Sequence, residues 1–103
     1  MTAYILTAEA ESDLRSVIRD TRAQWSAAQA RRYVSTLERV IAHLAEGKGP
    51  FKDMSALYPA LRMARCEHHY IFCLLREDAP ALIVAILHER MDIMKRLAGR
   101  LNE

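Results

Sequence analysis

A run of seven apolar residues that ends abruptly in charged residues constrains this fold most strongly. Residues 81–87 read Ala-Leu-Ile-Val-Ala-Ile-Leu and are followed at 88–92 by His-Glu-Arg-Met-Asp. The run is too short to cross a membrane, and its β-branched residues, entered after Pro80, are typical of a strand. Because no polar residue interrupts the run, we expect a central strand with both faces covered.

The first half of the chain predicts two amphipathic helices. Thr7 is placed to cap a helix that ends near Gln24, and Ser26 with Gln29 forms a capping box for a second helix, which Gly47 ends. Apolar residues recur at steps of three and four along both helices, at Ala10, Leu14, Val17, Ile18, Thr21, Trp25, Ala30, Tyr33, Leu37, Val40, Ile41 and Leu44. The short connection makes the helices antiparallel neighbours that can cover one face of a sheet.

Strands and a last helix are predicted around this pair. Residues 4–6 are β-prone, 51–59 read as a loop, and 61–66 and 69–75 form a hairpin whose turn is Glu67-His68. That turn sets Cys66 opposite His69 and Cys73 opposite Arg62, so we expect free thiols. Residues 89–101 predict a basic amphipathic helix on the other face, with methionines packed under it at Met63, Met91 and Met94.

The sequence therefore predicts one α+β domain over residues 1–103. An N-terminal strand precedes an antiparallel helical hairpin packed on an antiparallel β-sheet, and a C-terminal helix follows, in the order β-α-α-β-β-β-α. No segment resembles a signal peptide or a membrane span, which favours a cytoplasmic protein without a membrane partner. No cofactor is indicated.

The charge leaves the kind of partner open. A formal charge of +2 is too small to indicate nucleic acid, although twelve of the fifteen basic residues are arginine. Arginine makes bidentate contacts with carboxylates and with phosphates, so a protein and a nucleic acid are both possible partners.

Several of these segments resemble the ParE branch of the ParE/RelE toxin superfamily. The resemblance is carried by residues 4–7 leading to Ala10 and Asp13-Leu14, by Trp25, Ala30 and Tyr33, by Leu61-Arg62, and by residues 69–72. The most specific segment is 86–92, Ile-Leu-His-Glu-Arg-Met-Asp, which is similar to the family's ILHxRMD ending. The chain departs from the family pattern at Ser26, at Glu67-His68 and at Cys73.

The resemblance implies a toxin of a bacterial toxin-antitoxin pair. Such a toxin binds DNA gyrase as a stoichiometric inhibitor rather than an enzyme, and a cognate antitoxin holds it inactive in a hetero-oligomeric complex. A family member that only forms a regulatory complex is a further alternative.

The other branch of the superfamily cuts messenger RNA on the ribosome, and this chain offers candidates for that chemistry. They are Lys48, Lys52, Arg62, Arg65, Arg76 and His88. The last tyrosine is Tyr70, so the terminal tyrosine of many RelE-like toxins is missing. We therefore assign no catalytic residue and take this nuclease as the alternative.

Basic residues toward the C-terminus are the predicted partner contacts. The set also includes two arginines of the predicted hairpin and the histidine that ends the long strand. Its members are Arg62, Arg65, His88, Arg90, Lys95, Arg96 and Arg100. His88 also has a purely structural interpretation, as a half-buried side chain that fixes the turn into the last helix, and Asp92 is expected to cap or pair locally. A zinc site at Cys66, His68 and His69 lacks a fourth ligand, and we assign no metal.

Overall fold

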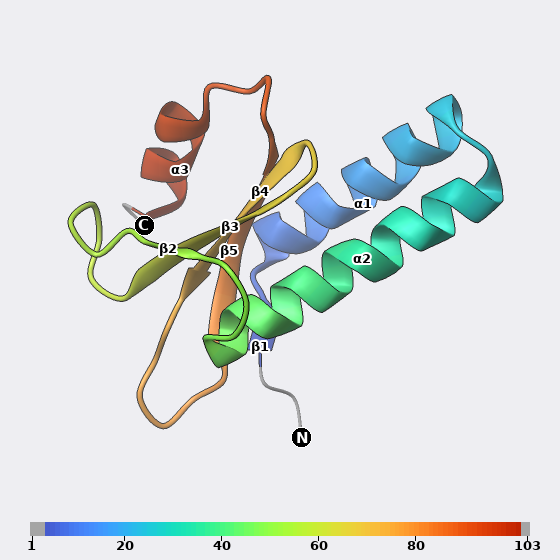
Figure 1. The fold of residues 1–103 in the computed structure, drawn as a ribbon. Coiled ribbons are helices and arrows are strands. Elements are labelled where there is room, and N and C mark those ends of the chain that lie inside the picture. The colour runs from blue at the N-terminus through green and yellow to red at the C-terminus, as the bar shows by residue number, and fades with distance from the viewer. Residues whose placement is uncertain (1–3, 102–103) are drawn as a thin grey trace.

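A computed structural model describes residues 4–101, in which one five-stranded sheet carries helices on both faces (Figure 1). The sheet order is β1-β5-β4-β3-β2. The elements are β1 (Tyr4–Leu6), α1 (Ala8–Gln24), α2 (Ala27–Glu46), β2 (Lys52–Asp53), β3 (Leu61–Cys66), β4 (His69–Leu74), β5 (Ala81–His88) and α3 (Ile93–Leu101). None of the described helices is both long and apolar enough to span a membrane.

The apolar run forms β5, which lies between β1 and β4 and is covered on both faces, as expected. Ile83 and Ile86 face the core under α1 and α2, whereas Val84, Ala85 and Leu87 face the core under α3. Val84 and Ala85 can share a face because a β-bulge shifts the register between Phe72 and Cys73 of β4. Cover on both faces explains why the run has no polar alternation.

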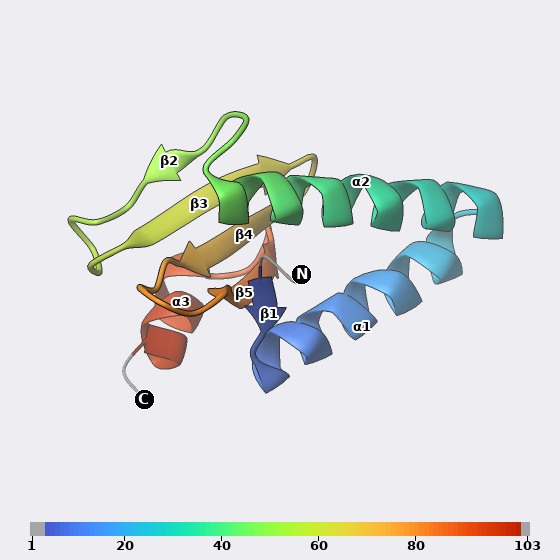
Figure 2. The same ribbon diagram turned by 90° about the horizontal axis from the view of Figure 1, so that it is seen from below.

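Both predicted helix caps are present. The Thr7 hydroxyl accepts a 3.0 Å hydrogen bond from the Ala10 amide, and Ser26 and Gln29 form the reciprocal capping box. The two helices form an antiparallel hairpin on one face of the sheet, and their connecting loop lies beyond the edge of the sheet (Figures 1 and 2). Trp25 caps the C-terminal end of α1 at this loop and is 43% exposed, so the expected place in the apolar stripe is wrong for this residue.

The β3–β4 hairpin has the predicted register. Cys66 pairs with His69 and Arg62 with Cys73, and both thiols are free and buried. Burial raises the pKa of the Cys73 thiol to about 11, which keeps it protonated at neutral pH.

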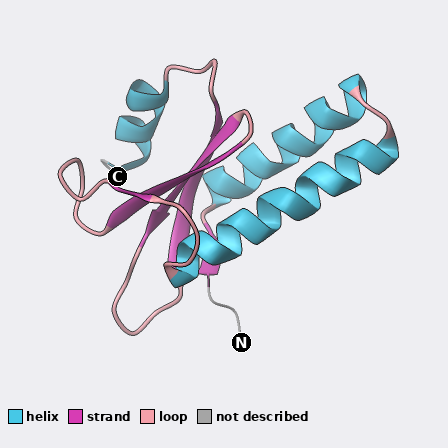
Figure 3. Cartoon of the chain, in the orientation of Figure 1, coloured by secondary structure: helices cyan, strands magenta, loops and turns pink. Residues whose placement is uncertain are grey.

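Three features of the sheet and the last helix depart from the expected fold (Figure 3). β1 pairs with β5 in parallel, so the sheet is mixed, and the segment expected to be only a loop contains the two-residue strand β2. The last helix begins at Ile93 rather than at Glu89, because residues 89–92 form a turn. Asp92 then caps the helix as expected, since its carboxylate accepts a 3.3 Å hydrogen bond from the Lys95 amide.

The methionines near α3 differ from the expectation of a buried cluster. Met63 is partly buried against the core that lies between the sheet and α3, but Met91 is 40% exposed and Met94 is 53% exposed. The helix is short, and Leu97 is its only fully buried residue among those the structure describes. The two methionines therefore add apolar area to the surface.

Candidate functional site

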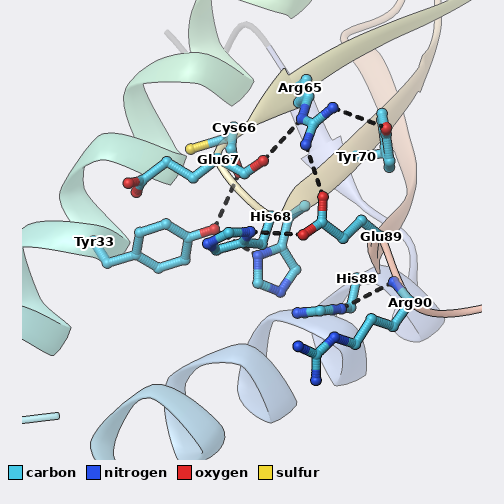
Figure 4. A network of polar contacts seen from close by, with 10 residues as sticks. Tyr33, Arg65, Cys66, Glu67, His68, Tyr70, His88, Glu89 and Arg90 are labelled. Atoms are coloured by element: carbon cyan, nitrogen blue, oxygen red, sulfur yellow. Dashed lines mark hydrogen bonds and ion pairs between the residues drawn. The ribbon is translucent and has the colours of Figure 1, made fainter. Parts of the chain in front are cut away.

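The seven predicted contact residues fall into separate places. Arg65 and His88 lie near one another at the end of the sheet where the β3–β4 turn meets the end of β5 (Figure 4). Arg62 lies at the opposite end of β3. Arg90, Lys95 and Arg96 are exposed beside and on α3, whereas Arg100 faces inward.

Glu89 holds Arg65 and His68 together across the two strand ends. Its two carboxylate oxygens lie 2.7 Å from Arg65 Nη2 and 2.7 Å from His68 Nδ1. The hydrogen bond from His68 and the nearby cationic groups lower the pKa of the Glu89 carboxyl, so it is ionised at neutral pH. Because an ionised carboxylate only accepts, Nδ1 of His68 carries the proton, and Nε2 is an acceptor when the ring is neutral.

His88 takes the structural position that its sequence context indicates. Nδ1 of its half-buried ring accepts a 3.1 Å hydrogen bond from the Arg90 amide, and its carbonyl accepts one from the Met91 amide. These contacts fix the turn that follows β5. They also place the proton of the neutral ring on Nε2, which is then a donor.

A buried tyrosine, Tyr33, and a partly buried histidine, His69, extend this cluster into the protein, and neither was assigned as a contact from the sequence. Tyr33 donates to the Cys66 carbonyl at 3.1 Å, and its hydroxyl oxygen lies 2.5 Å from His69 Nδ1. Burial, with the neighbouring histidines His68 and His88, lowers the pKa of His69 to about 4. Burial likewise raises the pKa of Tyr33, so both side chains are neutral at physiological pH. A hairpin prediction placed His69 correctly, but only tertiary structure brings it to Tyr33.

These side chains line part of a groove of about 730 Å³ between α1 and the end of the sheet. Polar residues of α1 form one wall, and the opposite wall is built from the turn, the end of β5 and α3. The groove residues with ionisable or aromatic side chains are Glu9, Asp13, Asp20, Trp25, Tyr33, His68, His69, His88, Arg90, Arg96 and Arg100. Among residues 4–101 no three acidic, histidine or cysteine side chains are placed to hold a metal ion.

Arg100 is not on a solvated face, so the expectation of an exposed contact is wrong for this residue. Its side chain is 13% exposed and forms a bidentate ion pair with Asp13, with both distances 2.9 Å. It also donates to the Val84 carbonyl at 2.8 Å. Asp13 in turn accepts from the Ile86 amide, so the pair joins α3 to α1 and to the edge of β5 beyond β1.

Arg62 also makes contacts inside the protein. Its guanidinium lies 4.5 Å from the centre of the Phe51 ring and donates to the Leu44 carbonyl at the end of α2. Arg76, a candidate for the nuclease alternative, donates to the Pro80 carbonyl in the β4–β5 loop. Neither guanidinium joins the cluster at the other end of the sheet.

The residues left available for a partner are exposed residues of α3 and of the turn before it. We call this set the α3 face and define it as Arg90, Met91, Met94, Lys95 and Arg96. The basic side chains of this face make no ion pair within residues 4–101, and both methionines are exposed. An unpaired cationic surface with adaptable apolar side chains is suited to bind an acidic protein surface.

Comparison with known proteins gives the class of this chain. Residues 4–93 match the family described as ParE toxin of type II toxin-antitoxin system, parDE. The chain is thus the toxin of a type II toxin-antitoxin system. It belongs to the ParE family: over 102 residues, 99% of either chain, it is 73% identical to the Toxin ParE of Escherichia coli. It is also 24% identical to the Toxin ParE1 of Mycobacterium tuberculosis, over 91% of this chain and 96% of that one.

Proposed function

We propose that this toxin acts in the cytoplasm by binding DNA gyrase as a stoichiometric inhibitor, without catalysis. The observation that supports this proposal best is the α3 face, where basic residues without an ion pair adjoin the exposed Met91 and Met94 in the sequence. Exposed methionines adapt to the shape of a bound protein. The proposal makes Arg90, Lys95 and Arg96 the primary contacts, with His88 supporting the turn that presents them.

We further propose that a cognate antitoxin neutralises the toxin in a hetero-oligomeric complex. Membership of a type II system supports a proteinaceous antitoxin. Arg62, Arg65 and Arg100 are engaged within the toxin, so their loss is expected to affect the fold before it affects the partner.

The test compares charge reversals on the α3 face with equal reversals elsewhere. Arg90→Glu with Arg96→Glu should abolish inhibition of gyrase supercoiling at stoichiometric toxin, because repulsion replaces attraction at a contact surface. Lys48→Glu with Lys52→Glu, at exposed positions beyond α2 and on β2, is the matched control and should inhibit like the unmodified toxin. Thermal unfolding verifies that both variants are folded. Full inhibition by the α3 variant would overturn the proposed contact surface, and no inhibition by the unmodified toxin would overturn gyrase as the target.

Ribosome-dependent RNA cleavage is a second candidate because of His68 and His88. In their neutral forms the first ring offers an acceptor at Nε2 and the second a donor at Nε2, and their centres lie 6.2 Å apart. A base that takes the proton of the attacking ribose 2′-hydroxyl and an acid that protonates the departing 5′-oxygen are the two groups that cleavage of the RNA backbone uses. Arg65 lies beside them and can stabilise phosphate charge.

The same protein preparations separate the two candidates. RNA cleavage on ribosomes that is lost in His68→Gln, with gyrase unaffected, would assign the function to the nuclease. Inhibition of gyrase that persists in His68→Gln supports action by binding.

A further inference from the structure

Positive charge is concentrated in the part of the helical hairpin next to its connecting loop, whereas the acidic Glu9, Glu11, Asp13 and Glu46 lie toward the other end of the two helices. Neither the α3 face nor the histidine cluster uses this basic part. Residues 15–39 contain six arginines and two acidic residues, for a formal charge of +4. Because the whole chain carries +2, the remaining residues carry −2. The small net charge thus hides a basic segment inside a chain that is otherwise slightly acidic.

The helical periodicity places these arginines on the outer face of the hairpin, away from the sheet. Arg15, Arg19 and Arg22 are spaced at steps of four and three along α1, and Arg32 and Arg39 are spaced by seven along α2, so each set forms one row. All five residues are exposed, as is Arg31, which lines a shallow groove between the helices together with Arg22 and the acidic Glu38. Packed helices lie about 8–10 Å apart, so the two rows form one broad basic surface.

Most of this charge is not neutralised within the protein. Arg19 makes a loose 3.6 Å contact with Asp20, and both side chains are highly exposed. No ion pair within residues 4–101 engages the other five arginines. Like charges gathered without partners destabilise a surface unless a polyanion covers it.

The single tryptophan of the chain lies at the end of this basic surface. Trp25 is 43% exposed, and its ring is held edge-on to Tyr33 with ring centres 6.0 Å apart. The ring therefore has a fixed orientation and an accessible face at the connection between the helices.

We infer that the outer face of the α1–α2 hairpin binds the phosphate backbone of duplex DNA. All six cations are arginines, the side chain that binds phosphate oxygens through two parallel hydrogen bonds. A basic surface two helices wide can engage both strands across a major groove about 12 Å wide, whereas a single acidic peptide would contact one row. Backbone contacts of this kind bind without reading sequence.

This surface extends the proposed function without depending on it. α3 packs on the opposite face of the sheet from the hairpin, so one molecule can contact DNA and a protein at the same time. DNA alone suffices to test the inference, whatever the protein target is.

The test measures binding of a labelled 20-base-pair duplex by fluorescence anisotropy between 50 and 200 mM salt. If about five arginines engage phosphates, log K should fall against log salt with a slope of about −4 to −5. Arg15→Gln, Arg22→Gln and Arg32→Gln together should reduce this slope by about 3 and weaken binding at 50 mM salt by roughly tenfold or more. Quenching of Trp25 fluorescence by DNA should accompany binding.

The matched control removes three charges from the other side of the sheet. Arg90→Gln, Lys95→Gln and Arg96→Gln together should leave the salt slope unchanged, although the net charge falls by the same amount. If both triple variants lost the same amount of DNA affinity and salt slope, net charge alone would explain the binding, and the inference would be overturned. Absence of DNA binding at 50 mM salt would also overturn it, and binding of poly-glutamate instead of DNA would assign the surface to an acidic protein.

Discussion

Gly47 ends α2 in a conformation that few other residues adopt, and its neighbour restricts it further. Its φ is 74° and its amide donates to the carbonyls of the preceding turn. A Cβ at this position would lie 2.9 Å from Nη1 of Arg62, which itself contacts the end of α2. Gly47→Ala should therefore lower the free energy of unfolding by about 1–2 kcal/mol, measured by urea denaturation.

Gly99 provides the opposite case within the same chain. It lies inside α3, where no atom lies within 4 Å of an added Cβ. Gly99→Ala should raise the free energy of unfolding by up to about 1 kcal/mol, because alanine is the better helix former. If both alanines destabilised the protein equally, the conformational argument for Gly47 would fail.

His69 makes stability depend on pH in a predictable direction. Its pKa is about 4 in the folded protein, against an ordinary 6.5, mainly because of burial. Between these values the unfolded chain binds more protons than the folded protein, so stability is complete above pH 6.5 and declines as the pH falls toward 4. The ring is partly exposed, so we expect a loss on the order of 1–2 kcal/mol.

The measurement is urea unfolding at pH 7.5 and at pH 5. His69→Asn should have a smaller difference between the two pH values than the unmodified protein has. His43→Asn, at an exposed position on α2, should leave the difference unchanged. If the free energy of unfolding of His69→Asn changed with pH as much as that of the unmodified protein, another titrating group would be responsible.

At the scale of elements, α3 is attached by an ion pair as much as by apolar area. Only Leu97 of this helix is fully buried, while Arg100 binds Asp13 and the Val84 carbonyl. Arg100→Ala should cost about 2–3 kcal/mol of stability, since it leaves the largely buried carboxylate of Asp13 without its cation.

A double-mutant cycle isolates the contribution of this pair. Asp13→Ala and Arg100→Ala should be coupled by about 1–3 kcal/mol in thermal or chemical unfolding. Arg96→Ala, one turn away and exposed, should change stability by less than about 0.5 kcal/mol. Strict additivity at Asp13 and Arg100 would show that α3 is held by its apolar contacts alone.

Local signals explain which elements could be predicted. Thr7, Ser26 and Gly47 bound their helices through caps that involve only the adjacent turn, and the two-residue turn at Glu67-His68 sets the β3–β4 register. β2 could not be predicted, because two exposed residues form a strand only where β3 presents an edge. The helix pattern before Ile93 was misleading because the ring of His88 captures a backbone amide and forms a turn.

At the scale of the whole molecule, the site was only partly predictable. Sequence periodicity correctly placed Arg90, Lys95 and Arg96 beside or on a basic helix, but it could not show that Arg100 pairs with a residue 87 positions away. The same limit applies to Tyr33 and His69, whose contact joins a helix to a hairpin. Residue types gave the candidates, and only the fold could separate structural arginines from those that face solvent.

Because β1 pairs with β5, the N-terminal strand of this toxin is synthesised well before the strand with which it pairs. Tyr4 finds its partner at Ala81, and Asp13 finds its partner at Arg100. At typical translation speeds of about 5–20 residues per second, the N-terminal strand waits roughly 4–15 s for its neighbour. The chain therefore completes its fold only when almost all of it has been made, and a nascent or truncated copy lacks the docked last helix. During synthesis in the cell there is thus a short interval in which most of the toxin chain has been made but is not yet folded.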